Sequence, residues 1–190
     1  MKPNVTVVSG LPRSGTSMMM KMLAAGGKTL MSDGIRRADE DNPGGYFECE
    51  KVKKLKVDNT WLAQAAGKAV KVVSRLLNDL PADCAYQVIF MQRNLDEILA
   101  SQAQMLRRLG QPAGDADDRE MRDLFIGHLR DVENWLSQQS RFSVLYINYN
   151  QILVEPRVQS LAVKRFLGGE LNVDQMAAVV DEGLYRQRAP

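Results

Sequence analysis

Residues 4–25 have the sequence NVTVVSGLPRSGTSMMMKMLAA, and this stretch decides the fold of the chain. Asn4 to Ser9 is rich in β-branched residues and runs into a glycine, which predicts a short buried strand. Thr16 to Ala25 predicts a helix with a broad apolar face, ended by Gly26 and Gly27. Because a strand that passes into a helix across a glycine loop opens an α/β unit, we expect an α/β fold.

Short apolar strands and helices alternate along the rest of the chain. The residue pattern predicts strands near 28–31, 69–73, 87–91 and 142–147, helical stretches near 48–66, 94–109, 121–136, 157–167 and 173–181, and polar loops at 32–45 and 110–118. Such alternation favours a three-layer sandwich with a central parallel sheet. Right-handed crossovers then place the carboxyl ends of the strands at one edge, where we expect the functional site.

The composition is typical of a soluble protein with one domain, here residues 1–190: 45% of the residues are apolar and 25% are charged. The net charge of +2 is too small to indicate a nucleic-acid-binding protein but suits one that holds an anionic small molecule. Cys49 and Cys84 lie far apart without zinc-ligand spacing, which favours a reducing compartment. No apolar run approaches a membrane span or a signal-peptide core, so we expect a cytoplasmic protein.

The loop from Gly10 to Ser17 has the length and the placement of a phosphate-binding loop. Backbone N–H groups of such a loop and the positive end of the following helix converge on one anionic group. Thr16 stands where the ATP- and GTP-binding version has its lysine, and the cation of the loop is Arg13. The hydroxyls of Thr16 and Ser17 can donate to a 5′-phosphate. A glycine turn without a ligand is the alternative interpretation.

A second cation stands where magnesium-nucleotide enzymes carry an aspartate. The strand near 87–91 is followed by Gln92 and Arg93, whereas an aspartate at such a strand end helps to hold Mg²⁺. The sequence therefore predicts a second site for an anionic group and no metal.

In these features the chain resembles the sulfotransferases that use 3′-phosphoadenosine 5′-phosphosulfate (PAPS). Pro12 to Ser17 matches their loop P-[KR]-S-G-[TS]-[TS], and the pair Arg93 and Ser101 matches the spacing of their 3′-phosphate site. The segment NPGGYFE (42–48) is similar to one in small bacterial sulfotransferases, and LYRQR (184–188) is similar more weakly. The resemblance implies a P-loop nucleotide-binding-like fold over most of the chain.

The resemblance also implies the donor and its ligands. PAPS would be the co-substrate and 3′,5′-adenosine bisphosphate the product, with a hydroxyl or amine of a small-molecule or glycan acceptor receiving the sulfuryl group and no metal taking part. The residues implied to bind the donor are Arg13, Ser14, Gly15, Thr16 and Ser17 at the 5′ end, and Arg93, Ser101 and Arg186 at the 3′-phosphate.

Four residues are candidates for the chemistry. Arg13 is expected to stabilise the charge that develops on the leaving phosphate. Lys71, in the predicted strand 69–73, resembles the family's strand-end lysine, and an exposed strand-end charge is the alternative. Cytosolic members carry a histidine two residues later, where this chain has Val73, so a carboxylate is expected as the base. Asp33 and Glu48 both remain candidates for that base.

The only histidine, His128, lies on the apolar stripe of its predicted helix and is expected to be a hydrogen-bonded core or boundary residue. Two other functions remain open beside sulfuryl transfer: a P-loop kinase, which needs a loop lysine and magnesium ligands, and a nucleotide-binding module without turnover. The loops 32–45 and 110–118 are expected to frame the acceptor site. Every apolar face can be used by the core, so the sequence predicts no particular oligomeric state.

Overall fold

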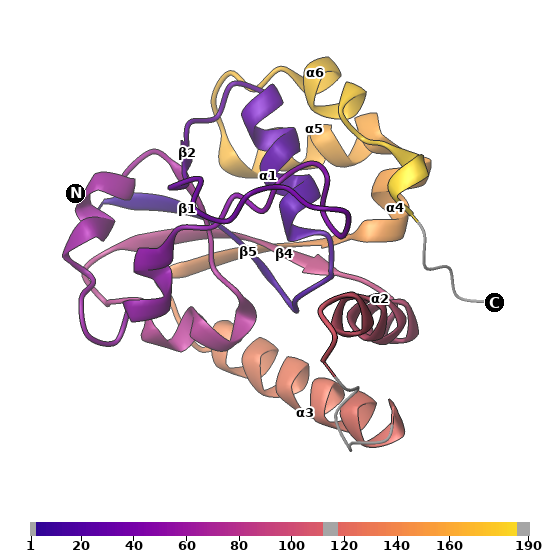
Figure 1. Cartoon of the computed structure of the whole chain (residues 1–190). Coiled ribbons are helices and arrows are strands. Elements are labelled where there is room, and N and C mark those ends of the chain that lie inside the picture. The colour runs from indigo at the N-terminus through magenta and orange to yellow at the C-terminus, as the bar shows by residue number, and fades with distance from the viewer. Residues whose placement is uncertain (1–2, 112–117, 186–190) are drawn as a thin grey trace.

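Five parallel strands form one sheet in the order β2-β3-β1-β4-β5 (Figure 1). The computed structural model describes residues 3–111 and 118–185. The strands are β1 (Asn4–Gly10), β2 (Leu30–Met31), β3 (Ala69–Lys71), β4 (Ala85–Gln92) and β5 (Phe142–Asn148). The prediction of an α/β sandwich around a parallel sheet is confirmed.

Helices cover both faces of the sheet. One face carries α1 (Thr16–Ala25), α4 (Tyr149–Val154), α5 (Pro156–Leu167) and α6 (Val173–Ala178), and the other carries α3 (Asp118–Ser137) with the 3-10 helices η1 (Glu50–Lys54), η2 (Thr60–Ala65) and η3 (Ser74–Asp79) (Figure 1). Helix α2 (Leu95–Arg108) follows β4 and packs against α3, and η4 (Glu182–Leu184) precedes the last described residue. Among the residues that the structure describes, no helix combines the length and the apolar character that a bilayer span requires.

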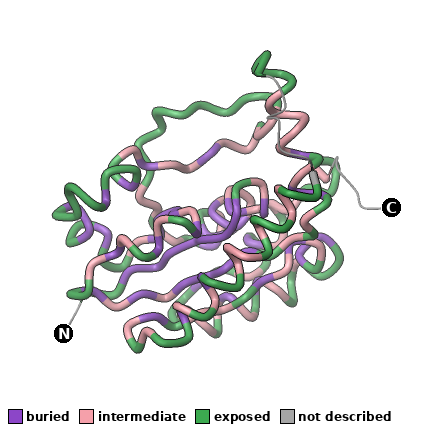
Figure 2. The backbone as a smooth tube through the Cα atoms, turned by 90° about the horizontal axis from the view of Figure 1, so that it is seen from below, coloured by how far each residue is buried: buried purple, intermediate pink, exposed green. Residues whose placement is uncertain are grey.

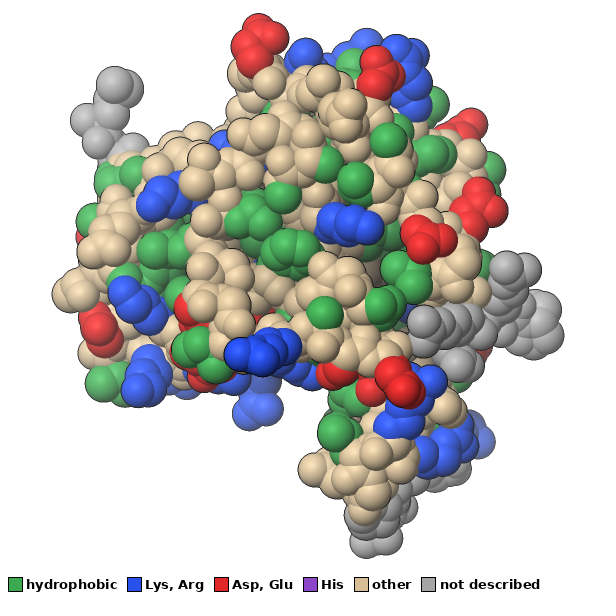
Figure 3. All heavy atoms as spheres, turned by 45° about the horizontal axis from the view of Figure 1, so that its top comes forward, with side chains coloured by type: hydrophobic (Ala, Val, Ile, Leu, Met, Phe, Trp, Pro, Cys, Tyr) green, Lys and Arg blue, Asp and Glu red, His purple; other side chains and the backbone are tan. Residues whose placement is uncertain are grey.

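The central strands are buried on both faces, as a parallel sheet between two helical layers requires (Figure 2). In β4, Val88 and Phe90 pack into the core under α3, whereas Ile89 and Met91 pack against the helices of the opposite layer. The alternation follows from the two-residue period of a strand. On the face shown in Figure 3, basic and acidic side chains are interspersed, and no extended basic patch is seen on that face.

Four local features differ from the sequence prediction. Residues 48–66 contain short 3-10 helices, and β3 ends at Lys71 because Val73 already begins the turn into η3. The helix expected over 173–181 ends at Ala178. Helix α4 was not predicted, since it starts directly after β5 and is too short for a helical period. Of the loop expected at 110–118, residues 112–117 lie outside the described residues.

The strand register brings separate parts of the sequence to one edge of the sheet. Gly10 of β1 is opposite Met91 of β4, and Val8 is opposite Lys71 of β3. The loop after β1, the turn after β4 and the end of β3 therefore meet at the carboxyl ends of adjacent strands. This is the edge where parallel α/β sheets bind their ligands.

Candidate active site

The loop after β1 has a backbone that only particular residues can adopt. Gly10 has a φ of +141° and Gly15 a φ of +98°. A Cβ atom on Gly10 would lie 2.6 Å from the carbonyl oxygen of Met91, and one on Gly15 would lie 2.4 Å from the Tyr149 ring. Arg13 also has a positive φ, +70°, which is rare for an arginine and is often found at functional sites. The loop is therefore held in a strained shape at the start of α1.

This loop faces a cavity of about 440 Å³. Seven basic residues line it, namely Arg13, Lys21, Arg36, Lys53, Lys71, Arg93 and Arg108, against three acidic residues, Asp41, Glu48 and Asp181. An excess of cations around a concave surface attracts an anionic ligand. Thr16 and Ser17 line the same cavity at the amino end of α1, where backbone dipoles also favour an anion.

Ser14 is placed differently from its neighbours. Its side chain is buried inside the loop and does not line the cavity, and its hydroxyl is among the few buried polar atoms of the described residues that lack a hydrogen-bond partner. Its N–H donates to the carbonyl of Leu11 at 3.2 Å and closes the turn. Gly15, by contrast, lies at the wall of the cavity. The cations, the hydroxyls and the helix end together fit a phosphosulfate group.

Lys71 reaches the cavity from the end of β3. Its ammonium group donates to the Ser17 hydroxyl at 3.1 Å and to the Tyr46 carbonyl at 2.9 Å, and lies 3.5 Å from a Glu48 oxygen. The side chain is 8% exposed. Burial lowers the pKa of Lys71, and the carboxylate of Glu48 opposes this shift. The structure thus places the strand-end lysine beside the phosphate-binding loop.

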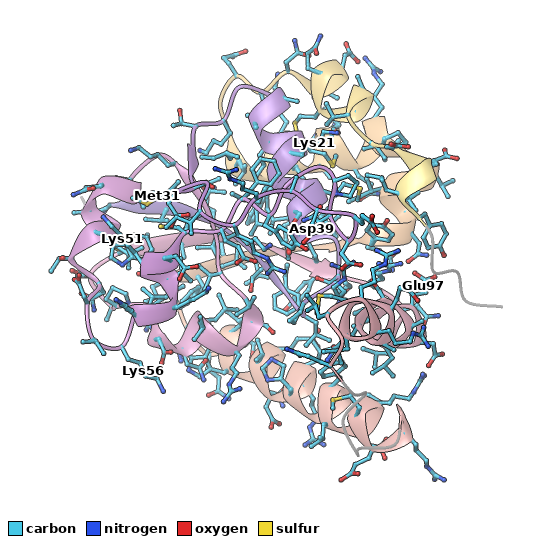
Figure 4. The ribbon with its side chains drawn as sticks, viewed as in Figure 1. Lys21, Met31, Asp39, Lys51, Lys56 and Glu97 are labelled. Carbon is cyan, nitrogen blue, oxygen red and sulfur yellow. The ribbon has the colours of Figure 1, made fainter. Side chains whose placement is uncertain are left out.

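The segment between β2 and η1 crosses this site. Asn42 donates to the Ser17 hydroxyl at 2.9 Å and to the Gly45 carbonyl at 2.7 Å. Arg13 donates to the carbonyl of Asp41 at 3.0 Å. The Tyr46 hydroxyl donates to Asp39 at 2.8 Å, and Figure 4 labels this aspartate. Hydrogen bonds therefore hold this segment against the loop after β1.

The two candidate bases occupy different places. Glu48 lines the cavity, 3.5 Å from Lys71 and 3.1 Å from the guanidinium of Arg36. Asp33 does not line the cavity, and its carboxylate accepts from the N–H of Glu50 at 2.6 Å and from that of Ile35 at 3.0 Å. The hydrogen bond from Glu50 is the main reason why the pKa of Asp33 lies below its usual value. The structure brings Glu48 to Lys71 and leaves Asp33 in the surrounding loop.

Arg93 and Ser101 both line the cavity, and each also has a hydrogen-bond partner within the protein. Arg93 donates through Nε to Glu97 at 2.8 Å and through a terminal nitrogen to the carbonyl of Arg13 at 3.0 Å. The Ser101 hydroxyl accepts from Nε of Arg13 at 2.9 Å. Arg13 therefore links the two residues. Arg186 lies outside the described residues.

His128 lies on α3 and does not line this cavity. Its Nε2 is 2.8 Å from the Ser74 hydroxyl, and burial lowers its pKa. The prediction of a hydrogen-bonded boundary histidine is confirmed. Within residues 3–111 and 118–185, no three His, Cys, Asp or Glu side chains gather as a metal centre would require.

Residues 3–186, nearly the whole chain, match the model of the sulfotransferase domain family. The chain belongs to this family. It is a sulfotransferase, and PAPS is the donor that this membership implies. No curated protein sequence matches the chain.

Solved structures agree with the fold of a sulfotransferase. The sulfotransferase domain of the curacin biosynthetic pathway is 15% identical with a TM-score of 0.56, and the match covers 99% of this chain and 92% of that one. Mouse sulfotransferase SULT7A1 in complex with PAP is 18% identical with a TM-score of 0.55, and retinol dehydratase in complex with androsterone and PAP is 16% identical with a TM-score of 0.53. This sulfotransferase covers only 63% and 64% of the latter two chains, which each cover 94% of it.

The sequence did not predict a functional role for several residues of the site. Asn42 and Tyr46 belong to the segment NPGGYFE, whose similarity to bacterial sulfotransferases could have identified them. Arg36 stacks over the Tyr46 ring at 3.5 Å and bonds Glu48, and no pattern in the sequence marks it. Glu97 was not identified as functional from the sequence either, and its carboxylate accepts a hydrogen bond from the guanidinium of Arg93.

Proposed function

We propose that this sulfotransferase transfers the sulfuryl group of PAPS to a hydroxyl or amine of a small-molecule or glycan acceptor without a metal ion. The acceptor atom forms a bond to sulfur while the bond from sulfur to the bridging oxygen breaks. 3′,5′-Adenosine bisphosphate leaves with the electron pair, and the acceptor proton passes to a base. The observation that carries the proposal is the contact of Lys71 with both Ser17 and Glu48 at the wall of a cationic cavity.

The donor would be held at its two charged ends. Backbone N–H groups of the loop, Arg13, Gly15 and the hydroxyls of Thr16 and Ser17 would bind the 5′-phosphosulfate, and buried Ser14 would shape the loop. At the opposite end, Arg93 and Ser101 would bind the 3′-phosphate, and Arg186 would be a further ligand. The apolar lining residues Met18, Val179 and Leu184 offer a surface for the adenine ring.

Lys71 and Glu48 would act on the transferring group and on the acceptor. The buried ammonium of Lys71 is fixed by the Tyr46 carbonyl, so it needs no reorganisation to stabilise charge as the donor bond breaks. Arg13 would share that role. Glu48 would accept the proton from the acceptor, because it is the candidate carboxylate that lines the cavity.

Asp33 would act as a positioning residue for this base. Its N–H donates to the carbonyl of Glu48 at 3.1 Å, and its carboxylate accepts from the N–H of Glu50 at 2.6 Å. These two bonds fix the backbone from the carbonyl of Glu48 to the N–H of Glu50. The carboxylate of Asp33 does not reach the cavity itself.

We also propose that residues 1–190 form a single cytoplasmic domain. Cys49 and Cys84 lie far apart in the sequence and lack the spacing of zinc ligands, which favours a reducing compartment. No role with nucleic acid is proposed, in keeping with the small net charge of +2.

A thermal-shift comparison followed by an assay tests the function. Stabilisation by 3′,5′-adenosine bisphosphate in the presence of EDTA is expected, whereas a requirement for magnesium and ATP would identify a kinase instead. The purified protein is then assayed with PAPS, EDTA and a panel of phenols, amines and sugars. Sulfated product from at least one acceptor supports the proposal. Tight nucleotide binding with no product across the panel would favour a binding module without turnover.

A further inference from the structure

Glu97 is a buried carboxylate that has no part in the proposed sulfuryl transfer. It lies in the first turn of α2, where Figure 4 labels it, and its side chain is 2% exposed. Within the described part of the chain, three donors from three segments reach it: Nε of Arg93 at 2.8 Å, the amide of Asn150 in α4 at 3.1 Å and the hydroxyl of Tyr185 at 2.5 Å. A buried charge with partners from separate segments ties those segments together.

The guanidinium of Arg93 is also packed against aromatic rings. It lies 4.3 Å from the centre of the Tyr149 ring and 5.7 Å from that of Tyr185. The two rings meet edge to face at 5.9 Å. The amide of Asn150 donates to the Tyr185 hydroxyl at 2.9 Å as well as to Glu97. Arg93 and Tyr185 thus both donate to the Glu97 carboxylate and both lie against the Tyr149 ring.

We propose that Glu97 is a positioning residue for recognition of the donor's 3′-phosphate, and that it couples the segment ending at Tyr185 to that recognition. Glu97 fixes the direction of the Arg93 guanidinium, and the same carboxylate holds the Tyr185 hydroxyl. The inference rests on the proposed function, in which Arg93 binds the 3′-phosphate.

Whether neutralising Glu97 strengthens or weakens binding of the 3′-phosphate distinguishes a purely electrostatic role from a positioning role. A carboxylate beside Arg93 lowers the local positive potential, so a purely electrostatic role predicts tighter phosphate binding when Glu97 is neutralised. A guanidinium binds phosphate through N–H groups of fixed geometry, so a positioning role predicts weaker binding. Burial raises the pKa of Glu97, but the hydrogen bonds from Tyr185, Arg93 and Asn150 outweigh this effect and hold the pKa below its usual value, which favours the ionised carboxylate.

The test is calorimetric titration of two nucleotides, 3′,5′-adenosine bisphosphate and adenosine 5′-phosphate, into the full chain. Glu97→Gln should weaken binding of the bisphosphate about tenfold, because it removes one charge-assisted hydrogen bond from Arg93. Binding of adenosine 5′-phosphate should change less than about twofold. With PAPS, KM should rise while kcat at saturating donor stays near the unmodified value. The control is Asp174→Asn, which breaks an exposed ion pair with Arg157.

A second variant tests the coupling to Tyr185. Tyr185→Phe removes one donor to Glu97 and leaves the bond to Arg93, so it should weaken bisphosphate binding about threefold. The double variant Glu97→Gln with Tyr185→Phe should be no weaker than Glu97→Gln alone, because both changes act through one carboxylate. If the double variant loses as much bisphosphate affinity as the two single variants lose together, the proposed coupling is wrong. Circular dichroism melting checks each fold, and if Glu97→Gln does not fold, Tyr185→Phe alone must show the loss confined to the bisphosphate.

The outcomes distinguish this inference from the proposed function. If the unmodified protein binds the two nucleotides equally, the assignment of a 3′-phosphate site fails. If it prefers the bisphosphate and Glu97→Gln keeps or increases that preference, the positioning role fails while the site stands. Equal weakening of both nucleotides would show a general structural effect and would also overturn the inference.

Discussion

The ammonium nitrogen of Lys71 lies 3.5 Å from a carboxylate oxygen of Glu48. Lys71 ends strand β3, whereas Glu48 belongs to the segment that precedes η1. The bond from Lys71 to the Tyr46 carbonyl, two residues before Glu48, fastens that segment to the sheet. A cation and a carboxylate from different parts of the chain are thereby fixed at one wall of the cavity.

The proposed base predicts a separation between three variants. Glu48→Gln should lower kcat by a factor on the order of 10² to 10⁴, because the acceptor proton loses its base. Asp33→Asn should have a smaller effect, since that side chain holds the backbone around Glu48, and His128→Gln should leave kcat close to normal. Steady-state assays with PAPS measure all three. A folded but inactive His128→Gln protein would show that the base has been misassigned.

The same assignment predicts the acid side of the pH profile. The rate should fall on the acid side, because a protonated base cannot accept another proton. In Glu48→Gln this acid limb should disappear from the residual activity. An unchanged acid limb in that variant would exclude Glu48.

Lys71 predicts the alkaline side of the profile. Because burial lowers its pKa below 10.5, activity should decline at a pH below that at which free lysine deprotonates. Lys71→Arg should move this decline to higher pH, since arginine stays protonated, and Lys71→Met should lower kcat by about 10² to 10³. A pH–rate profile of each variant checks this. Identical alkaline limbs in the unmodified and arginine proteins would contradict it.

The lowered pKa of Lys71 also has a consequence for stability. Between the lowered folded-state pKa and 10.5, the unfolded chain binds a proton that the folded chain has released, so this residue makes the free energy of unfolding rise with pH in that window. Lys71→Met should remove this contribution. Urea titrations at several alkaline pH values measure the difference between the two proteins.

Arg13→Ala should lower turnover by about 10² to 10³ while the melting temperature stays nearly unchanged, because the cation faces the ligand cavity and not the core. Arg157→Ala, which removes an exposed arginine paired with Asp174, is the matched control and should keep full activity. Near-normal activity of Arg13→Ala would refute its role at the leaving group.

The 3′-phosphate site predicts a preference for the bisphosphate over adenosine 5′-phosphate by a factor on the order of 10². Arg93→Ala should erase most of this preference and Ser101→Ala a smaller part, because a charged donor contributes more than a neutral hydroxyl. Affinity for adenosine 5′-phosphate, held by the loop after β1, should barely change. Calorimetric titration of both nucleotides gives the ratio directly.

Two glycines provide a matched test of the phosphate-binding loop. Gly15 and Gly27 have similar φ values, +98° and +93°, but a Cβ on Gly27 meets no atom within 4 Å, whereas one on Gly15 would overlap the Tyr149 ring. Both alanine variants carry the backbone strain, about 1–3 kcal/mol. Gly15→Ala should in addition lose nucleotide affinity, measured by titration, while Gly27→Ala should bind normally. Equal nucleotide affinity in the two would contradict the argument.

The parts of the fold that local patterns encode could be predicted. The strand, loop and helix over 4–25 match β1 and α1, and the helix predicted over 121–136 from apolar residues at three- and four-residue steps matches α3, because burial on one face imposes such periods. Short elements could not be predicted. Helix α4 has six residues, and its start depends on the Asn148 side chain, which accepts from the N–H groups of Asn150 and Gln151.

Within the site, residue types were predictable but partners were not. Arg93 and Ser101 line one cavity as expected from their spacing, yet Ser101 bonds Arg13 while Arg93 bonds Glu97. Such choices depend on side-chain directions across different elements, which no local period encodes. The choice between Asp33 and Glu48 is of the same kind, since it depends on which carboxylate the backbone between β2 and η1 turns toward the cavity.

Strand β1 starts at the end of the sheet opposite the cavity, and the loop that lines the cavity follows its last residue. The seven residues of β1 therefore separate its amino end from the cavity. Tyr185, in contrast, lies within hydrogen-bonding distance of Glu97, beside the proposed 3′-phosphate arginine (Figure 1 marks both ends of the chain). Immobilisation on a sensor surface or fusion to a fluorescent reporter through the amino end therefore leaves nucleotide access open. The same attachment after Tyr185 would disturb Tyr185 and Glu97, which orient Arg93.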